Sequence, residues 1–294
     1  MTAPRQVLRD TTCLVTRRCA RRQFLLRPGR ITNDVFLYVL AVAARRHGLL
    51  IHAFCVLSNH YHLVVTDPRA RLPAFIQLLN CLVGRALNAA LHRDDAFWES
   101  RSFSAVTLPT PDDAADKAAY VLANPVAAGL VERGKMWPGL WSDPAQLGVG
   151  RIEVRRPRHF FDPEGDLPEQ EVLELTIPPG FDSAAAFREV VEAGLAERES
   201  VARRTFRRFL GVARVLGQRV SARPQEESPR GALQPRVASR DVGKRIEVLG
   251  RLKAFLGEYR QAFAARREGR AGVVFPVGTY QLRVEHGVAC LGYG

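Results

Sequence analysis

The chain has 294 residues and a formal net charge of +13, and 39 of its 43 basic residues are arginine. This length suits one or two domains, because single cores seldom grow beyond about 250 to 300 residues. The five cysteines are odd in number and contain no Cys-x-x-Cys pair, which argues against a disulfide framework or a thiolate zinc site. No apolar run of about 18 residues occurs, so no membrane span is predicted.

The arginine excess favours a polyanionic partner. Arginine pairs bidentately with phosphate and stacks on bases, so the composition is typical of nucleic-acid binding. A GC-rich genome that encodes arginine wherever a cation will serve would give the same composition, and composition alone leaves both explanations open. The N-terminal residues MTAPRQVLRDTT lack an apolar signal core, so we expect a protein of the reducing cytoplasm that associates with the nucleoid.

The first 150 residues alternate strand and helix patterns. Residues 11–19 suit a strand, and residues 33–47 have helical spacing, with Asn33 as N-cap and Gly48 just past the end. The β-rich runs LLIHAFCVL and HYHLVV are separated only by the dipeptide Ser58-Asn59. This spacing predicts a β-hairpin.

The next elements are an amphipathic helix over 72–93 and a strand over 97–108. A last helix then opens with Thr110 as N-cap and Asp113 completing an acidic capping box. It is expected to end near Asn124, which precedes a proline. The order is that of a ferredoxin-like (RRM-like) α+β domain over residues 1–150: an antiparallel sheet with helices on one face, plus one added helix.

The composition changes after this domain. Residues 151–200 carry 6 basic and 12 acidic residues, and the acidic, proline-rich part over 151–182 is interpreted as a linker. Residues 201–294 carry 19 basic and 7 acidic residues, so the region 183–294 is predicted to be basic, mainly helical and a candidate DNA-binding unit.

Within this C-terminal region we expect a long helix over 183–220, a tract of low order over 221–241, a helix over 241–267 and a terminal strand pair. The run RRTFRRFLGVARVLGQR interleaves arginine with Phe206 and Phe209. It suits either a DNA-gripping surface or a solvated helix face, and its spacing does not identify a helix-turn-helix.

Two histidines begin the second hairpin strand. Because side chains alternate along a strand, His60 and His62 share one face while Tyr61 lies on the other with the apolar residues. If the apolar set packs under the helices, the imidazoles stand on the open face, where a pair can hold a divalent metal. Surface or hydrogen-bonded histidines are the alternative interpretation.

A tyrosine and an asparagine share one face of the last helix. Tyr120 and Asn124 are four residues apart, so they lie about one turn from each other. The asparagine offers a neutral oxygen ligand and the tyrosine a nucleophile, which a metal would assist by polarising a phosphodiester. Such an attack exchanges one phosphodiester for another and needs no ATP, and no Walker loop is present. A buried tyrosine followed by an Asn-Pro helix stop is the alternative.

These motifs carry a family resemblance. LSNHYHLVV followed by YVLANPVAAGLV resembles the single-tyrosine HUH endonucleases, and in particular the REP-associated tyrosine transposases, over residues 5–137. The resemblance implies a metal-dependent single-stranded DNA endonuclease and strand transferase acting beside DNA hairpins. His60, His62 and Asn124 would bind Mg²⁺ or Mn²⁺, and Tyr120 would become linked to a 5′-phosphate.

The chain departs from the family pattern in two places. The residue between the histidines, usually a plain hydrophobe, is Tyr61, and the chain continues for about 160 residues past the compact transposases. The resemblance leaves open whether Tyr120 acts within its subunit or across a homodimer. A non-catalytic DNA-hairpin-binding regulator is the alternative function; relaxases and replication initiators usually carry a third histidine that is absent here.

An arginine cluster follows the first strand. We expect phosphate contacts from this cluster, because arginines gathered on one side grip a DNA backbone without reading bases, while ordinary solvation is the alternative. Its members are Arg17, Arg18, Arg21, Arg22 and Arg27.

Overall fold

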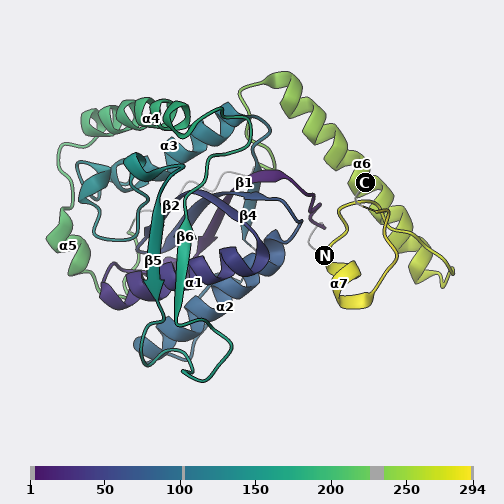
Figure 1. The fold of residues 1–294 in the computed structure, drawn as a ribbon, viewed down its shortest axis with the longest axis horizontal. Coiled ribbons are helices and arrows are strands. Elements are labelled where there is room, and N and C mark those ends of the chain that lie inside the picture. Colours follow the sequence, from purple (N-terminus) through teal and green to yellow (C-terminus); the bar gives the residue numbers. More distant parts are fainter. Residues whose placement is uncertain (1–3, 101–102, 226–234, 293–294) are drawn as a thin grey trace.

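The computed structural model describes residues 4–100, 103–225 and 235–292, and its centre is a four-stranded antiparallel sheet of order β2-β3-β1-β4 (Figure 1). Helix α1 (Arg30–His47) joins β1 to β2, and α2 (Leu72–Ala90) joins β3 to β4. The predicted ferredoxin-like α+β fold is therefore confirmed. The strands are β1 (Thr11–Arg18), β2 (Leu50–Leu57), β3 (His60–Asp67) and β4 (Ser104–Thr107).

The pleat of β3 sends alternate side chains to opposite faces of the sheet. The Tyr61 ring meets Phe36 of α1 edge-on at 5.2 Å between centroids, and its hydroxyl donates to Asn80 Oδ1 of α2 at 2.9 Å. Tyr61 thus faces the α1–α2 layer. The residues on either side of it, His60 and His62, must face the other way.

That second face is covered by α3 (Pro111–Ala127), with α4 (Ala184–Thr205) packed on α3 (Figure 1). The capping box is present: Thr110 Oγ1 accepts from the Asp113 amide at 3.1 Å, and the Asp113 carboxylate accepts from the Thr110 amide at 3.2 Å. Helices α1 and α2 therefore form the predicted layer on one face of the sheet. The added helix, α3, lies on the opposite face.

Two predicted helix boundaries are wrong. Helix α3 passes Asn124 and includes Pro125, which removes one helical hydrogen bond, while the buried Pro125 and Val126 keep this last turn packed. Helix α1 begins at Arg30 after Gly29 rather than at Asn33, whose side-chain amide instead donates to the Pro138 carbonyl at 3.1 Å.

The segment interpreted as a linker folds into a hairpin. Strands β5 (Arg151–Arg155) and β6 (Gln170–Glu174) pair antiparallel and pack on α1, where the Tyr38 hydroxyl donates to the Pro168 carbonyl at 2.5 Å. Leu173 is buried while the adjacent Glu174 is exposed. The strand pattern of this segment is therefore not apparent from its composition, which is dominated by acidic residues.

The C-terminal region is more broken than predicted. Helix α4 ends at Thr205 because Phe206 turns away to pack against Gly129, so the expected helix over 183–220 is divided into α4 and α5 (Val212–Leu216). Helix α6 (Val242–Arg267) matches its prediction closely. Residues 226–234 of the tract predicted to have low order lie outside the described residues.

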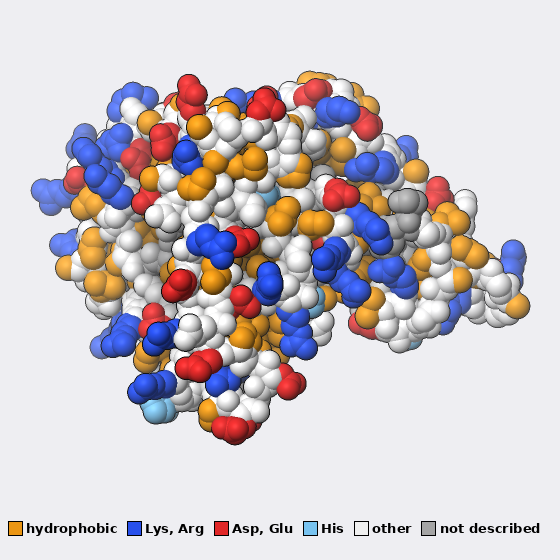
Figure 2. Space-filling model, viewed as in Figure 1, with side chains coloured by type: hydrophobic (Ala, Val, Ile, Leu, Met, Phe, Trp, Pro, Cys, Tyr) orange, Lys and Arg blue, Asp and Glu red, His pale blue; other side chains and the backbone are white. Residues whose placement is uncertain are grey.

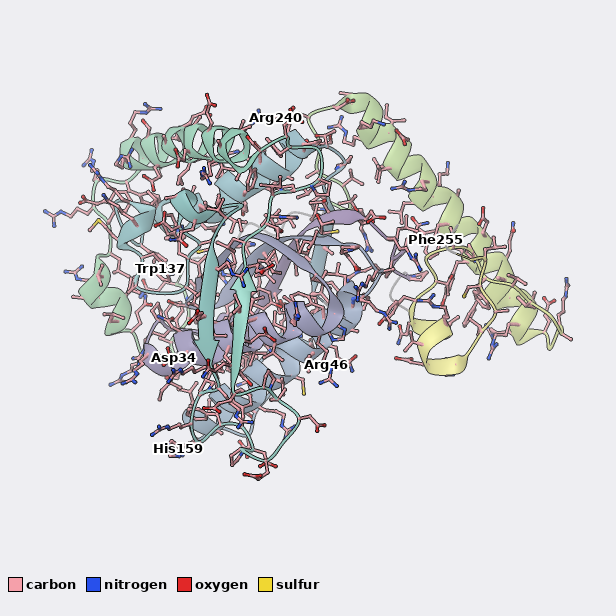
Figure 3. The ribbon with its side chains drawn as sticks, in the orientation of Figure 1. Asp34, Arg46, Trp137, His159, Arg240 and Phe255 are labelled. Atoms are coloured by element: carbon pink, nitrogen blue, oxygen red, sulfur yellow. The ribbon has the colours of Figure 1, made fainter. Side chains whose placement is uncertain are left out.

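The predicted terminal strand pair is wrong. The segment instead contains α7 (Gln281–His286) and a single bridge between Phe275 and Cys290. Phe255 is buried on α6 beside this C-terminal segment, and Tyr259 of the same helix meets Phe275 at 5.5 Å (Figure 3). No described helix combines the length and apolarity needed to cross a bilayer.

Both outer strands of the sheet carry later segments of the chain. Along β2, the Thr176 amide donates to the Ile51 carbonyl at 2.8 Å, and the segment around Trp141 pairs with Cys55. Along β4, the Thr107 amide donates to the Arg236 carbonyl at 2.9 Å. These pairings satisfy backbone groups that an edge strand would otherwise expose.

A buried histidine makes the stability of the fold pH-dependent. His52 Nδ1 donates to the Thr176 carbonyl at 2.9 Å, and its Nε2 lies 2.7 Å from Thr66 Oγ1. Burial lowers the pKa of His52 from 6.5 to about 4. The unfolded chain therefore binds a proton at this residue below pH 6.5 that the folded chain takes up only near pH 4.

We expect the free energy of unfolding to fall as the pH drops from about 6.5 to about 4, with His52 accounting for up to about 3 kcal/mol. Denaturant unfolding across this range measures it, and His52→Gln should reduce the slope of the free energy of unfolding against pH, while His60 and His62 keep part of it. An equal slope in both proteins would contradict the assignment to His52.

Candidate active site

Two imidazoles and a phenol lie together between β3 and α3. The His60 and His62 rings meet at right angles with centroids 4.8 Å apart, and the Tyr120 ring lies 5.7 Å from that of His62. His62 is 5% exposed and Tyr120 40% exposed, so the phenol stands at the open side of the pair. The structure thus brings together residues from two distant elements within one chain.

The neighbour of His60 sets its tautomer. Asn59 Nδ2 donates to the Arg22 carbonyl at 3.3 Å, which turns Asn59 Oδ1 toward His60 Nδ1 at 2.6 Å. Because that oxygen can only accept, His60 Nδ1 carries the proton and Nε2 keeps its lone pair. His62 Nδ1 is likewise engaged, 2.7 Å from Thr16 Oγ1.

Both imidazoles are held neutral. Burial, with further contributions from the positive charges of Arg18 and Arg22, lowers the pKa of His60 to about 4. Burial, with His60 and Arg18, holds the pKa of His62 well below its usual value. Neutral imidazole with a lone pair on Nε2 is the form that binds metal ions.

Helix α3, which carries Tyr120, offers Asn124 as a third candidate metal ligand. Asn124 donates through Nδ2 to the Tyr120 carbonyl at 3.4 Å, which leaves its side-chain oxygen outside that bond. Together with the two imidazole nitrogens, this amide oxygen would give a set of ligands that suits a divalent cation while leaving positions for water or phosphate. Within the described ranges, no group of three or more His, Cys, Asp or Glu side chains could hold a metal, so a site here needs the amide oxygen or water.

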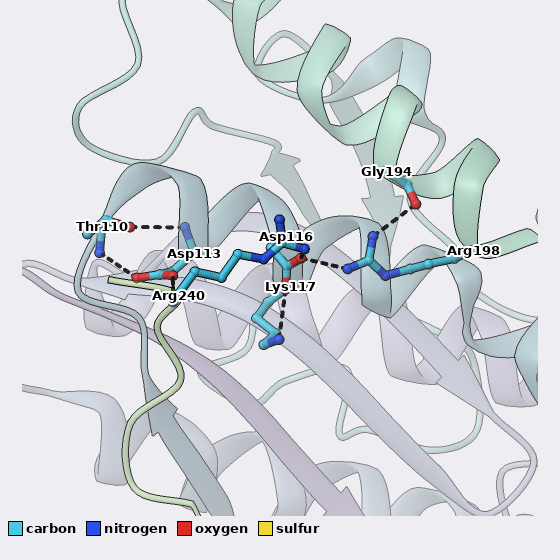
Figure 4. Close-up of polar contacts among 7 residues, drawn as sticks. All are labelled: Thr110, Asp113, Asp116, Lys117, Gly194, Arg198 and Arg240. Carbon is cyan, nitrogen blue, oxygen red and sulfur yellow. Dashed lines mark hydrogen bonds and ion pairs between the residues drawn. The ribbon is translucent and has the colours of Figure 1, made fainter. Parts of the chain in front are cut away.

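A charged cluster fixes the helix that carries the phenol (Figure 4). Asp116 Oδ1 lies 2.6 Å from Arg198 of α4 and 2.8 Å from Arg240, and Oδ2 lies 2.8 Å from Lys117. Burial alone would raise the pKa of Asp116, but the hydrogen bonds and charges of Lys117 and Arg198 lower it below its usual value. Since Lys117 Nζ is also 5.9 Å from the Tyr120 ring centroid, the cluster reaches the candidate site.

The predicted arginine cluster is divided between the two faces of the sheet. Arg17 lies on the Tyr61 face, with its guanidinium carbon 5.9 Å from the Trp98 ring centroid. Arg18 pairs with His60 in the β1–β3 register and lies on the histidine face. The predicted one-sided arrangement is therefore wrong, because successive residues of a strand alternate.

The remaining three arginines follow β1. Arg21 and Arg22 form a left-handed turn, with φ of 52° and 59°, that places the Arg22 carbonyl against Asn59. Arg27 Nη1 donates to the Gln218 carbonyl at 2.7 Å, which joins this loop to the C-terminal region. Contact of any of these arginines with DNA stays a prediction.

Sequence reasoning missed the two residues that orient the histidines. Asn59 was interpreted only as half of a hairpin turn, and Thr16 only as part of a strand. The register supplies the missing signal, since Thr16 pairs with His62 across β1 and β3 and both side chains lie on one face.

We expect Asn59→Ala to weaken Mn²⁺ binding by roughly 10- to 100-fold, because the proton position on His60 is no longer fixed. Isothermal titration of the folded variant with Mn²⁺ measures the change. Asn33→Ala, which removes an amide bonded to the Pro138 carbonyl, is the matched control and should bind as the unaltered chain does. Equal affinities in the two variants would refute the role of Asn59.

Comparisons with known proteins give structural similarity at low identity. No family model matches the chain, and no curated protein does. The chain is similar to a REP-associated tyrosine transposase solved with a REP hairpin, at 20% identity and a TM-score of 0.38, over 47% of this chain and 81% of that one. It is also similar to a candidate transposase from Deinococcus radiodurans R1, at 20% identity and a TM-score of 0.29, over 36% and 85%. The predicted resemblance is confirmed as similarity over part of the chain.

Proposed function

We propose that the chain is a metal-dependent, transposase-type endonuclease and strand transferase for single-stranded DNA, with Tyr120 as its nucleophile. One observation carries the proposal: the Tyr120 ring lies 5.7 Å from His62, whose ring lies 4.8 Å from His60. Solvated surface histidines would not be expected to be buried, neutral and oriented by dedicated hydrogen bonds beside a phenol.

His60 and His62, through Nε2, and the side-chain oxygen of Asn124 would hold Mg²⁺ or Mn²⁺. The bound ion would supply polarisation of the phosphodiester and neutralisation of its charge. The donor set fits this ion because it is neutral, contains two nitrogens and one oxygen, and leaves coordination positions open.

The protein's own chemistry is a transesterification. The Tyr120 hydroxyl oxygen bonds to phosphorus as the bond from phosphorus to the 3′ oxygen breaks. The phenol proton passes to solvent, and the departing 3′ oxygen takes up a proton. The products are a 5′-phosphotyrosine link and a free 3′-hydroxyl, and the reverse reaction rejoins strands because each phosphodiester replaces another of similar energy.

The surroundings of the site suit a DNA strand. Arg18 and Arg22 place positive charge near the imidazoles, where phosphate oxygens would lie. Tyr120 already stands beside His62 of the same chain, which favours attack within one subunit. A hairpin next to the cleaved strand is proposed from the motif resemblance.

Incubation of the full chain with labelled single-stranded hairpin oligonucleotides and Mn²⁺ tests the function. We expect a shifted band that survives denaturation and contains both protein and DNA. Hairpin binding without such a band at any Mn²⁺ concentration would overturn the proposal and support the alternative of a DNA-binding regulator without catalytic activity.

A further inference from the structure

The end of α4 and the segment that follows it expose many arginines. Residues 201–225 contain seven arginines and no acidic residue. All seven are exposed, and among the described residues only Arg203 forms an ion pair, with Glu199 at 3.0 Å. We name this set the arginine belt: Arg203, Arg204, Arg207, Arg208, Arg214, Arg219 and Arg223.

The aromatic residues and one valine of the same segment pack inward, while Val201 and Leu216 are exposed. The Phe206 and Phe209 rings contact each other at 5.7 Å and pack against the core, and Val215 is fully buried. Neither phenylalanine is thus presented as a base-stacking platform. The segment is anchored by its apolar side while the arginines remain in solvent, as the basic margin near α5 in Figure 2 shows.

The middle of the belt is fixed to the chain just after α3, the helix that carries Tyr120. The Leu210 amide donates to the Gly129 carbonyl and the Gly211 amide to the Leu130 carbonyl, each at 2.9 Å. Gly129 lies two residues after the end of α3 and has φ of 67°, and a Cβ there would meet the Phe206 ring at 3.0 Å. The belt therefore passes the end of α3, the helix that carries Tyr120 and Asn124.

The C-terminal end of the belt is fixed to the loop beside the histidines. Arg27 Nη1 donates to the Gln218 carbonyl at 2.7 Å, and the Phe24 amide donates to the Ala222 carbonyl at 3.0 Å. This is the loop whose Arg22 carbonyl orients Asn59. The belt thus joins the two structural elements that build the candidate site.

We propose that the arginine belt binds the phosphate backbone of single-stranded DNA that flanks the strand held at Tyr120. This inference rests on the proposed function and extends it to a part of the chain outside the motifs. Exposed arginines without acidic partners add little to folding stability, while they gain electrostatically from a polyanion. The contacts would be independent of base sequence, since phosphate contacts position a strand without reading it.

The test is the salt dependence of binding by the full chain. The triple variant Arg207→Gln, Arg208→Gln, Arg214→Gln should bind a labelled single-stranded oligonucleotide roughly 10-fold or more weakly at about 0.15 M salt. The slope of log affinity against log salt should fall by about 2, since each single-strand phosphate contact contributes about 0.7. Fluorescence anisotropy in EDTA measures both without cleavage.

Two matched variants make the result specific. Arg260→Gln, Arg266→Gln, Arg267→Gln removes the same charge from exposed positions on α6 and should leave the slope unchanged. The triple variant Arg207→Lys, Arg208→Lys, Arg214→Lys should retain the slope, because it keeps the charge. Equal losses from the belt and the α6 variants would overturn the proposal, as would binding of phosphatidylserine vesicles in place of the oligonucleotide.

The arginine belt and the proposed nuclease function can be tested independently. A reduced slope in the belt variant without any covalent adduct in the unaltered chain would support the belt and reject the nuclease. An adduct in the unaltered chain with an unchanged slope in the belt variant would support the nuclease and reject the belt.

Discussion

Tyr120→Phe should abolish the covalent protein–DNA adduct while leaving hairpin binding within about twofold. Phenylalanine keeps the ring that lies 5.7 Å from His62 and removes only the hydroxyl. The side chain is 40% exposed, so the change should alter stability by less than about 0.5 kcal/mol. Denaturing electrophoresis with labelled oligonucleotide and Mn²⁺ detects the adduct, and anisotropy measures the binding.

Tyr259→Phe is the matched control, since Tyr259 lies on α6 and contacts Phe275 in the C-terminal segment. It should form the adduct at the rate of the unaltered chain. Persistence of the adduct in Tyr120→Phe would reject Tyr120 as the nucleophile, and loss in both variants would point to a defect unrelated to the candidate site.

His62→Ala should reduce Mn²⁺ affinity by more than roughly 100-fold and remove adduct formation with it. Loss of an outer-shell partner alone costs up to about 100-fold, and here one of only two imidazoles is lost. The remaining imidazole and amide would hold a divalent ion poorly. Titration calorimetry with Mn²⁺ measures the binding independently of any activity.

Because His62 is buried against Thr16, its removal also tests folding, so His60→Ala serves as a second variant at the more exposed position. His286→Ala, on the exposed surface of α7, is the control and should bind Mn²⁺ normally. Unchanged Mn²⁺ affinity in a folded His60→Ala variant would place the ion elsewhere.

Much of the fold could be predicted from local signals. The two-residue Ser58-Asn59 turn between β-rich runs indicated the β2–β3 hairpin, and Thr110 with Asp113 indicated the start of α3. These features depend on neighbours within a few residues. The element order then limited the topology to a ferredoxin-like sheet.

Features that depend on distant contacts could not be predicted. The break after α4 arises because Phe206 packs against Gly129, far away in sequence, and nothing local requires it. The β5–β6 hairpin depends on burial of Leu173 against a surface that the sequence does not display. In the composition of such a segment, the acidic residues outweigh the few buried apolar residues that indicate a strand.

The candidate site shows the same division. Strand alternation correctly placed His60 and His62 on one face and Tyr61 on the other. The role of Asn59 depends on a left-handed turn at Arg21 and Arg22, which non-glycine residues rarely adopt and no local pattern predicted. The sequence pattern therefore indicated which side chains form the candidate site, while tertiary contacts determine how those side chains are oriented.

The covering of both outer strands has a consequence for engineering the molecule. A shortened chain ending near residue 150 would lose the backbone partners that Arg236 and Ala238 give Thr107, and the one that Thr176 gives Ile51. Its sheet would then offer two unpaired rims to other copies, a geometry that promotes aggregation. The N-terminal half therefore depends on later residues of the chain to cover both edges of its sheet.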